Sequence, residues 1–404
     1  MSTDFKIDLH PDVSMIIDRF ERAGHEAYLV GGSLRDTLLG RVAFDNDLTT
    51  SALPEQTLGL FSDLRTVPTG LKHGTVTLIT KSGLPVEVTT FRTDGTYSDS
   101  RHPDSVSFTR SLSEDLARRD FTVNAMAYAP KKGLVDLFGG REDLSKGIIR
   151  CVGDPERRFS EDALRILRGF RFSAQLDFEI EENTLKAALD IGQNISKIAR
   201  ERIATELLKT LSSPKPSKAL SLMLPIMPVI LPKITVEPSR IPLCDSIPPE
   251  PIERLALLVH GLDCSEVASS LRLSNIQKKE LGLIAGFSES RLPKTPSEAR
   301  RLLSSFGDSP HLAIAALRVY STISGKDLSR EEMLVSTELN SSPCLSISGL
   351  CVTGSDLIQK GITPGKQLGF ILSELLDAVI DDPSLNRKDT LIALCENIKE
   401  KNNL

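Results

Sequence analysis

Two aspartates separated by one residue, Asp45 and Asp47, are the clearest candidates for chemistry in this chain. In an extended strand, residues i and i+2 point to one face, roughly 7 Å apart. Two such carboxylates can hold a pair of Mg²⁺ ions about 4 Å apart, which activate a hydroxyl nucleophile and neutralise a triphosphate and its leaving pyrophosphate. Asp-Asn-Asp is also ordinary turn chemistry, so the flanking residues must decide between the two interpretations.

A glycine turn lies upstream of these aspartates, within the segment LVGGSLRDTLLGRVAFDNDLTT at 29–50. An apolar strand ends there, two glycines follow, and Ser33 is expected to cap a short helix over 34–39. The backbone N–H groups at such a helix start, including that of Gly32, favour phosphate, and Arg35 is placed to contact the same phosphates. The pattern matches neither the dinucleotide-binding nor the P-loop fingerprint.

A second candidate segment is LARRDFTVNAMAYA, residues 116–129. One interpretation is a solvated helix start that Asp120 caps. The other places Arg119 on a triphosphate and Asp120 on a ribose hydroxyl. The segment alone does not decide between them.

A third segment, RRFSEDALRILRGFRF at 157–172, has helical periodicity. Its apolar residues share an arc of about 100°. The opposite half carries one carboxylate and three guanidiniums, spaced three residues apart: Asp162, Arg165, Arg168 and Arg171. This pattern fits a solvated face with an ion pair worth a few tenths of a kcal/mol. It also fits a base-recognition pair, in which Asp162 accepts a hydrogen bond from the edge of a base and Arg165 donates to it. The other two arginines would then bind phosphate or have a structural role.

The composition describes an ordinary globular protein with room for two to four domains. Of 404 residues, 40% are apolar and 25% charged, and the net charge is −5. This charge argues against a general nucleic-acid binder but allows a local basic groove. No apolar run is long enough to span a membrane, and the first residues lack the pattern of a signal peptide, so we expect a cytoplasmic protein.

Element by element, the first 140 residues predict mixed α and β structure and the rest predicts helices. Strands are expected over 27–30, 75–80 and 86–91. Helices are expected over 12–23, 160–172, 182–191 and 200–211. Proline- and serine-rich stretches at 212–217, 232–251, 291–297 and 340–343 indicate joints between helical units. The predicted fold class is α+β, with a small α/β nucleotidyltransferase head before an all-helical remainder.

Together these segments resemble the bacterial-type class II tRNA nucleotidyltransferases, the CCA-adding enzymes, of which poly(A) polymerases are near relatives. The loop 91–108 is similar to the family's mobile loop, and residues 352–376 to the end of its RNA-binding tail. The resemblance covers nearly the full length. The matching motifs are GGSLRD with DND, RRDFTVNAMA, EDALRILR and IARERIATEL.

The resemblance implies four parts: a catalytic head at 1–140, a base-recognising neck at 141–211, a body at 212–297 and a tRNA-binding tail at 298–404. It implies that Asp45 and Asp47 bind Mg²⁺, and that Asp162 and Arg165 pair with the edge of incoming CTP or ATP. The partner would be the 3′ acceptor end of tRNA, with no membrane and no protein partner implied.

The activity so implied is addition of C, C and A to tRNA from CTP and ATP without a nucleic-acid template. A CC-adding enzyme, an A-adding enzyme and a poly(A) polymerase stay open within the family. A non-catalytic RNA-binding protein on the same fold is a further alternative, but it predicts loss of Asp45 or Asp47, and both are present. Glu87 is expected on a strand near the site, and we favour structural hydrogen bonding for it over a third catalytic carboxylate.

Overall fold

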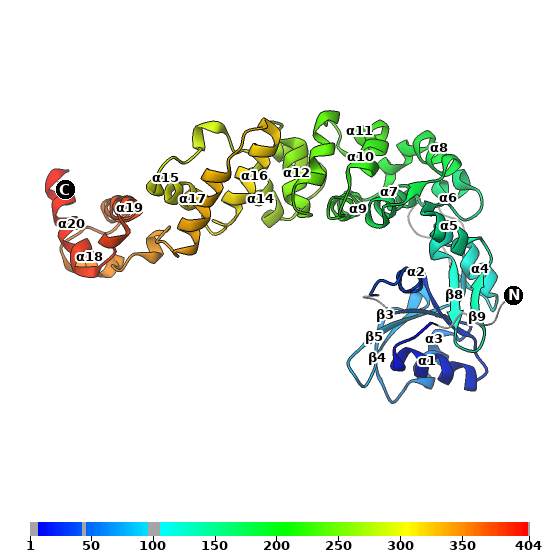
Figure 1. Ribbon diagram of the computed structural model, residues 1–404. Helices are drawn as coiled ribbons and strands as arrows, with labels where there is room; N and C mark the ends of the chain where they lie inside the picture. The colour runs from blue at the N-terminus through cyan, green and yellow to red at the C-terminus, as the bar shows by residue number, and fades with distance from the viewer. Residues whose placement is uncertain (1–6, 43–45, 96–105, 403–404) are drawn as a thin grey trace. The chain divides into compact units, whose positions relative to one another are not determined.

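The computed structural model describes residues 7–42, 46–95 and 106–402 (Figure 1). The chain divides into two compact units, Met1–Thr235 and Val236–Leu404. The boundary falls inside the proline-rich stretch 232–251, which the sequence indicates as a joint. The finer division into head, neck, body and tail stays a prediction. Among the described residues, no helix has the length and apolar character needed to cross a membrane.

A seven-stranded mixed sheet forms the first part of the chain, in the order β3-β4-β5-β2-β1-β8-β9 (Figure 1). The strands predicted from the β-branched runs are confirmed to within one residue. β2 and β5 are parallel, and their register sets Asp47 opposite Glu87. The other neighbouring strands are antiparallel. The strands are β1 Ala27–Val30, β2 Asp47–Thr50, β3 Arg65–Gly70, β4 Thr75–Ile79, β5 Pro85–Thr90, β8 Met126–Ala129 and β9 Gly133–Asp136.

Amphipathic helices pack on this sheet. α1, Pro11–Arg22, buries one apolar stripe and contacts β1, and α3, Pro54–Leu60, contacts β4. The rings of Phe20 and Phe61 meet edge to face, 5.0 Å apart, and join the two helices. A separate two-stranded ribbon, β6 Arg92–Asp94 with β7 Val106–Phe108, lies outside the main sheet.

The helix after the glycine turn starts earlier than the sequence predicts. α2 spans Gly31–Leu38, so the expected start at residue 34 and the capping role of Ser33 are wrong. Gly31 has φ +70°, a conformation that glycine adopts at no steric cost, and this lets the chain turn directly from strand into helix. Ser33 Oγ instead accepts a hydrogen bond of 3.1 Å from the backbone N–H of Asp47. The hydroxyl therefore fixes the start of β2 against α2.

The helix predicted over 160–172 is interrupted. α6, Pro155–Glu161, ends at Asp162, whose backbone is extended at φ −140° and ψ 102°. The Asp162 carboxylate accepts from the N–H of Leu164, where α7, Leu164–Leu176, begins. α7 packs against α9, Arg200–Leu211, and α6 against α8, Glu182–Asp190. The predicted ranges of α8 and α9 are confirmed.

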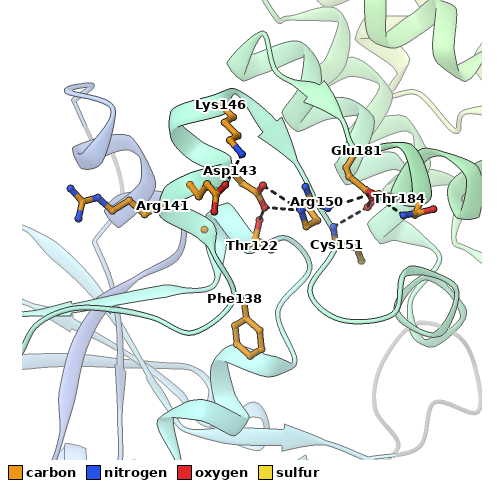
Figure 2. A network of polar contacts seen from close by, with 12 residues as sticks. Thr122, Phe138, Arg141, Asp143, Lys146, Arg150, Cys151, Glu181 and Thr184 are labelled. Atoms are coloured by element: carbon orange, nitrogen blue, oxygen red, sulfur yellow. Dashed lines mark hydrogen bonds and ion pairs between the residues drawn. The ribbon is translucent and has the colours of Figure 1, made fainter. Parts of the chain in front are cut away.

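Buried polar contacts connect the sheet region to these helices (Figure 2). Asp143, on α5 (Gly140–Lys146), accepts a 2.7 Å hydrogen bond from Thr122 Oγ1 and binds Arg150. Arg150 reaches Glu181, whose carboxylate accepts from the N–H of Thr184 at the start of α8. A short parallel pair, β10 Ile148–Ile149 with β11 Glu179–Ile180, runs beside this network.

The second unit is helical throughout its described length. Arg300, 7% exposed, donates to the carbonyl oxygens of Ile380 and Asp381 and pairs with Glu338, so one guanidinium joins three helices. The α-helices of this unit are α12 Pro251–Val259, α13 Cys264–Ser270, α14 Asn275–Ala285, α15 Pro296–Ser305, α16 Leu312–Ser324, α17 Ser329–Asn340, α18 Gly354–Gln359, α19 Lys366–Asp381 and α20 Lys388–Lys401.

Two glycines should respond oppositely to alanine. A Cβ on Gly140 would lie 2.2 Å from the carbonyl oxygen of Thr122, so Gly140→Ala must displace backbone and should reduce the free energy of unfolding by about 1–3 kcal/mol. Gly59 is exposed within α3 with open space around it, so Gly59→Ala should raise stability by up to about 1 kcal/mol. Urea unfolding of both variants measures this. Equal effects would contradict the close packing at Gly140.

Candidate active site

Asp47 is the first residue of β2, and the parallel register puts Glu87 beside it on the same face of the sheet. The backbone of Asp47 is held by Ser33, and the N–H of Glu87 donates to the carbonyl oxygen of Asn46. Glu87 is exposed. Asp45, the other predicted carboxylate, lies outside the described residues. The structure thus places Asp47, one half of the predicted pair, near the N-terminus of α2.

The glycine turn brings Asp47 and an arginine close together. A Cβ on Gly31 would be 3.4 Å from Arg119 Nη1 and 3.6 Å from Asp47 Oδ2. A Cβ on Gly32 would be 3.6 Å from Arg35 Nη2. Side chains from two distant segments, Asp47 and Arg119, therefore meet Arg35 of α2 at the turn. The absence of side chains at the two glycines leaves room for them.

Arg35 is 8% exposed and firmly held. It donates to Asp36 and, at 2.9 Å, to Asn124 Oδ1, and its guanidinium carbon lies 5.1 Å from the centre of the Phe172 ring. It also lines a cavity of about 600 Å³, together with Asp36, Arg41, Val42, Gln175, Leu176 and Ser212 to Pro214. The triphosphate contact of Arg35 stays a prediction.

Asp120, which is buried, forms an ion pair at 2.6 Å with Arg168, whose side chain is 34% exposed. It also accepts hydrogen bonds from the N–H of Phe121 and from Asn124 Nδ2. Burial acts to raise the pKa of Asp120, but Arg168 and these hydrogen bonds outweigh it and lower the pKa to about 2. Asp120 is 8% exposed, so the interpretation as a solvated helix start is wrong. Its contact with a ribose stays a prediction.

Two of the three arginines of α7 are buried and the third, Arg168, is 34% exposed, so the interpretation as a solvated face is wrong for Arg165 and Arg171. Arg165 and Arg171 are each 7% exposed. Arg165 pairs with Glu161 at 2.9 Å and donates to the carbonyl oxygen of Arg118. Arg171 pairs with Glu206 at 3.1 Å. The guanidinium carbons of Arg168 and Arg171 lie 5.2 and 4.4 Å from the centre of the Phe172 ring, a favourable cation–π geometry.

Asp162 does not share the helical face of these arginines, because the break between α6 and α7 sets it apart. Its side chain is 17% exposed, and Oδ2 lies 3.9 Å from Arg202 Nη2. Burial raises the pKa of Asp162, and the charges of Arg202 and Arg165 only partly oppose this. The break thus presents a partly desolvated carboxylate beside two cations.

Three contributors to this site have no predicted role in the sequence. Asn124 links Arg35 to Asp120, Phe172 packs under three guanidiniums, and Arg202 faces Asp162. Asn124 and Arg202 lie inside the quoted segments RRDFTVNAMA and IARERIATEL, so the motifs offered a signal for both. Phe172 offered none, because its periodicity is that of an ordinary core residue.

The donor set suits a hard divalent cation. Asp47 supplies carboxylate oxygens, and Glu87 stands next to it; oxygen donors of this kind fit Mg²⁺. Among the described residues, no group of three His, Cys, Asp or Glu side chains is close enough to hold a metal.

Comparison with known proteins agrees with the geometry. Residues 27–150 match the model of the poly A polymerase head domain, residues 177–235 that of a probable RNA and SrmB-binding site of polymerase A, and residues 260–395 that of a putative tRNA nucleotidyltransferase domain 2. The chain is 38% identical to the CCA-adding enzyme of Leuconostoc mesenteroides, over 94% of each chain. The chain belongs to the CCA-adding enzyme family.

Other members of the CCA-adding enzyme family support this assignment. The enzyme of Levilactobacillus brevis is 36% identical, over 94% of this chain and 95% of its own. The crystal structure of the Bacillus stearothermophilus CCA-adding enzyme in complex with CTP superposes with a TM-score of 0.82. It is 32% identical and covers 98% of this chain and 100% of its own. The α+β fold predicted from the sequence is confirmed.

The ion pair of Asp120 predicts an acid-dependent loss of stability. Its folded pKa of about 2 lies below the ordinary aspartate value of 3.8, so the pair contributes fully above pH 4 and its contribution is lost as the pH falls toward 2. The difference corresponds to about 2 kcal/mol. Asp120→Asn should lower the free energy of unfolding at pH 7 by at least about 2 kcal/mol, and the deficit should shrink between pH 4 and pH 2.

Denaturant unfolding across this pH range measures the effect. Asp190→Asn, which removes an exposed carboxylate at the end of α8, is the matched control and should follow the parent curve. A constant deficit of Asp120→Asn at every pH would show that charge on Asp120 is not the cause.

Proposed function

We propose that this chain adds C, C and A in turn to the 3′ end of tRNA, using CTP and ATP and no nucleic-acid template. The observation that carries the proposal is full-length similarity to CCA-adding enzymes, in a chain that brings Asp47, Arg35 and Arg119 together at the glycine turn. The complex of the Bacillus stearothermophilus relative with CTP supports CTP as a substrate. The helical second unit would hold the tRNA by its shape and phosphates.

In the reaction, the terminal 3′-oxygen of tRNA forms a bond to the α-phosphorus of the nucleotide. The bond between the α-phosphorus and the oxygen that bridges it to the β-phosphate breaks, and pyrophosphate leaves. Two Mg²⁺ ions, held by Asp45 and Asp47, would supply activation of the hydroxyl and neutralisation of the leaving group. Arg35 and Arg119, with the N–H of Gly32, would bind the triphosphate. The positive end of α2 adds to this attraction.

Asp162 and Arg165 would recognise the base. Cytosine and adenine each carry an exocyclic amino group that a carboxylate accepts, whereas uracil presents a carbonyl oxygen there. The distance between Asp162 Oδ2 and Arg202 Nη2 is 3.9 Å, which is too long for a hydrogen bond. Oδ2 can therefore accept a hydrogen bond from the amino group of a base. Arg165 is fixed by Glu161, which orients its donor fork before the nucleotide arrives. Arg168 and Arg171, both paired with acids, would support this arrangement.

The principal alternative is poly(A) polymerase activity, which the family models for residues 27–150 and 177–235 favour by description. The deciding experiment supplies labelled CTP and ATP to a tRNA that ends at its discriminator base. The proposal expects two C residues and one A, and then a stop. Runs of A would indicate the polymerase, and products ending in CC, or growth only from CC, would indicate the partial enzymes.

The aspartate pair is tested by Asp45→Ala and Asp47→Ala. Each should lower turnover by several orders of magnitude and leave the unfolding temperature close to that of the parent, because both carboxylates are proposed to act on the reacting groups and not in the core. The control is Asp63→Ala, which removes a half-exposed carboxylate paired with Arg19 on the surface. Near-normal turnover of Asp47→Ala with Mg²⁺ would refute the assignment.

Base selection is tested by Asp162→Ala. Without the carboxylate, the carbonyl oxygen of UTP is no longer repelled, so discrimination against UTP should fall roughly 5- to 150-fold. Sequencing of the tRNA 3′ ends made in mixtures of CTP, ATP and UTP gives the ratio. Glu156→Ala, an exposed change on α6, should keep the parent selectivity. If Asp162→Ala rejects UTP as strongly as the parent does, Asp162 does not select the base.

A further inference from the structure

A buried carboxylate, that of Asp115, forms a hydrogen bond with Arg119, the arginine that approaches Asp47 at the glycine turn. Asp115, on α4 (Leu112–Ala117), is 0% exposed and accepts hydrogen bonds on both oxygens. Oδ1 accepts from Arg118 Nε at 3.0 Å, from Arg118 Nη2 at 2.8 Å and from the N–H of Arg92 at 3.3 Å. Oδ2 accepts from Thr49 Oγ1 at 3.1 Å and from Arg119 Nη2 at 3.3 Å. These five donors saturate the carboxylate.

The cluster holds one negative charge between two positive ones. Burial acts to raise the pKa of Asp115, but Arg118 and Arg119 outweigh it, so the group stays ionised. One carboxylate cannot neutralise two guanidiniums. Of the other carboxylates near Arg119, Asp120 pairs with Arg168, and Asp47, across the glycine turn, is proposed to bind metal. The second positive charge is therefore available to an anion.

The two arginines share Asp115 unequally. Arg118 makes two short hydrogen bonds to one oxygen. Arg119 makes long ones, 3.3 Å to Asp115 and 3.4 Å to the carbonyl oxygen of Asn124. Its Nε is buried and has no hydrogen-bond partner among the described residues. Burial lowers the pKa of Arg119, and Asp115 only partly opposes this. Arg119, which also approaches Asp47, is the arginine whose hydrogen bonding is incomplete.

We propose that Asp115 is a positioning residue for the nucleotide. It neutralises and fixes Arg118, and thereby leaves the charge of Arg119 for the phosphates of the incoming nucleoside triphosphate. Through Thr49, two residues along β2 from Asp47, it also holds the arginine pair at a set distance from the catalytic strand. The inference rests on the proposed function for its substrate, and it assigns distinct roles to two adjacent arginines.

The first test is Asp115→Asn, which keeps the size of the side chain and removes its charge. KM for CTP and for ATP should rise together by about tenfold or more, with a smaller change in kcat. The reason is that Arg119 loses its orientation toward the phosphates, which the two nucleotides share. The affinity of CTP, measured by calorimetry without tRNA, should fall by the same factor. A purely structural role would lower the unfolding temperature and leave the affinity of the folded protein unchanged.

The second test separates the two arginines. Arg119→Lys should raise KM for both nucleotides and keep the parent unfolding temperature. Arg118→Lys should lower the unfolding temperature and raise KM less. Thr49→Val, which removes only the hydroxyl, should raise KM severalfold. These three variants decide the question if Asp115→Asn does not fold.

The inference is overturned if folded Asp115→Asn binds CTP as the parent does, or if the two arginine variants behave alike. Failure of the proposed function looks different. In that case the unmodified chain adds neither C nor A to tRNA, while the calorimetric comparison of CTP affinities still reports on Asp115.

Discussion

The ion pair between the buried carboxylate of Asp120 and the partly exposed Arg168 is the contact on which the candidate site depends. It joins the segment after α4 to α7, and Asn124 extends it to Arg35 on α2. Breaking the pair leaves the buried charge of Asp120 uncompensated, which costs several kcal/mol, so the partners stay together. As a result, the glycine turn, which we propose binds the phosphates, and α7, which we propose faces the base, are held by one continuous set of hydrogen bonds.

Pairing also explains how so many arginines can lie close together. Buried guanidiniums are tolerated when each has an acidic partner. Arg35 has Asp36, Arg118 has Asp115, Arg165 has Glu161, Arg168 has Asp120 and Arg171 has Glu206. Such pairing stiffens the side chains and leaves few free to reorganise. The site is thus preorganised for a highly charged ligand, although the whole chain has a net charge of −5.

Most of the elements that local patterns in the sequence predicted have the expected bounds to within one residue, but these patterns missed the start of α2 and the break between α6 and α7. The β-branched runs gave β1, β4 and β5, and apolar periodicity gave α8 and α9. The start of α2 depends on the positive φ of Gly31, and the break at Asp162 depends on a side-chain cap, which periodicity does not report. The burial of Arg165 and Arg171 was missed for a related reason. Periodicity separates apolar from polar residues, and a polar residue becomes a core residue only through partners that lie far along the chain.

The long sequence separation of these partners has a consequence for the order of folding. Arg35 meets Asn124 across 89 residues, and β1 pairs with β8 about 100 residues later. Closing such loops costs chain entropy before any contact repays it, so contacts of this kind form slowly and late. During synthesis, the glycine turn is made early, but Arg35 can meet Asn124, and Asp120 can meet Arg168, only after much more of the chain has been made. A growing chain therefore presents no finished nucleotide site until well over a third of the protein has been made.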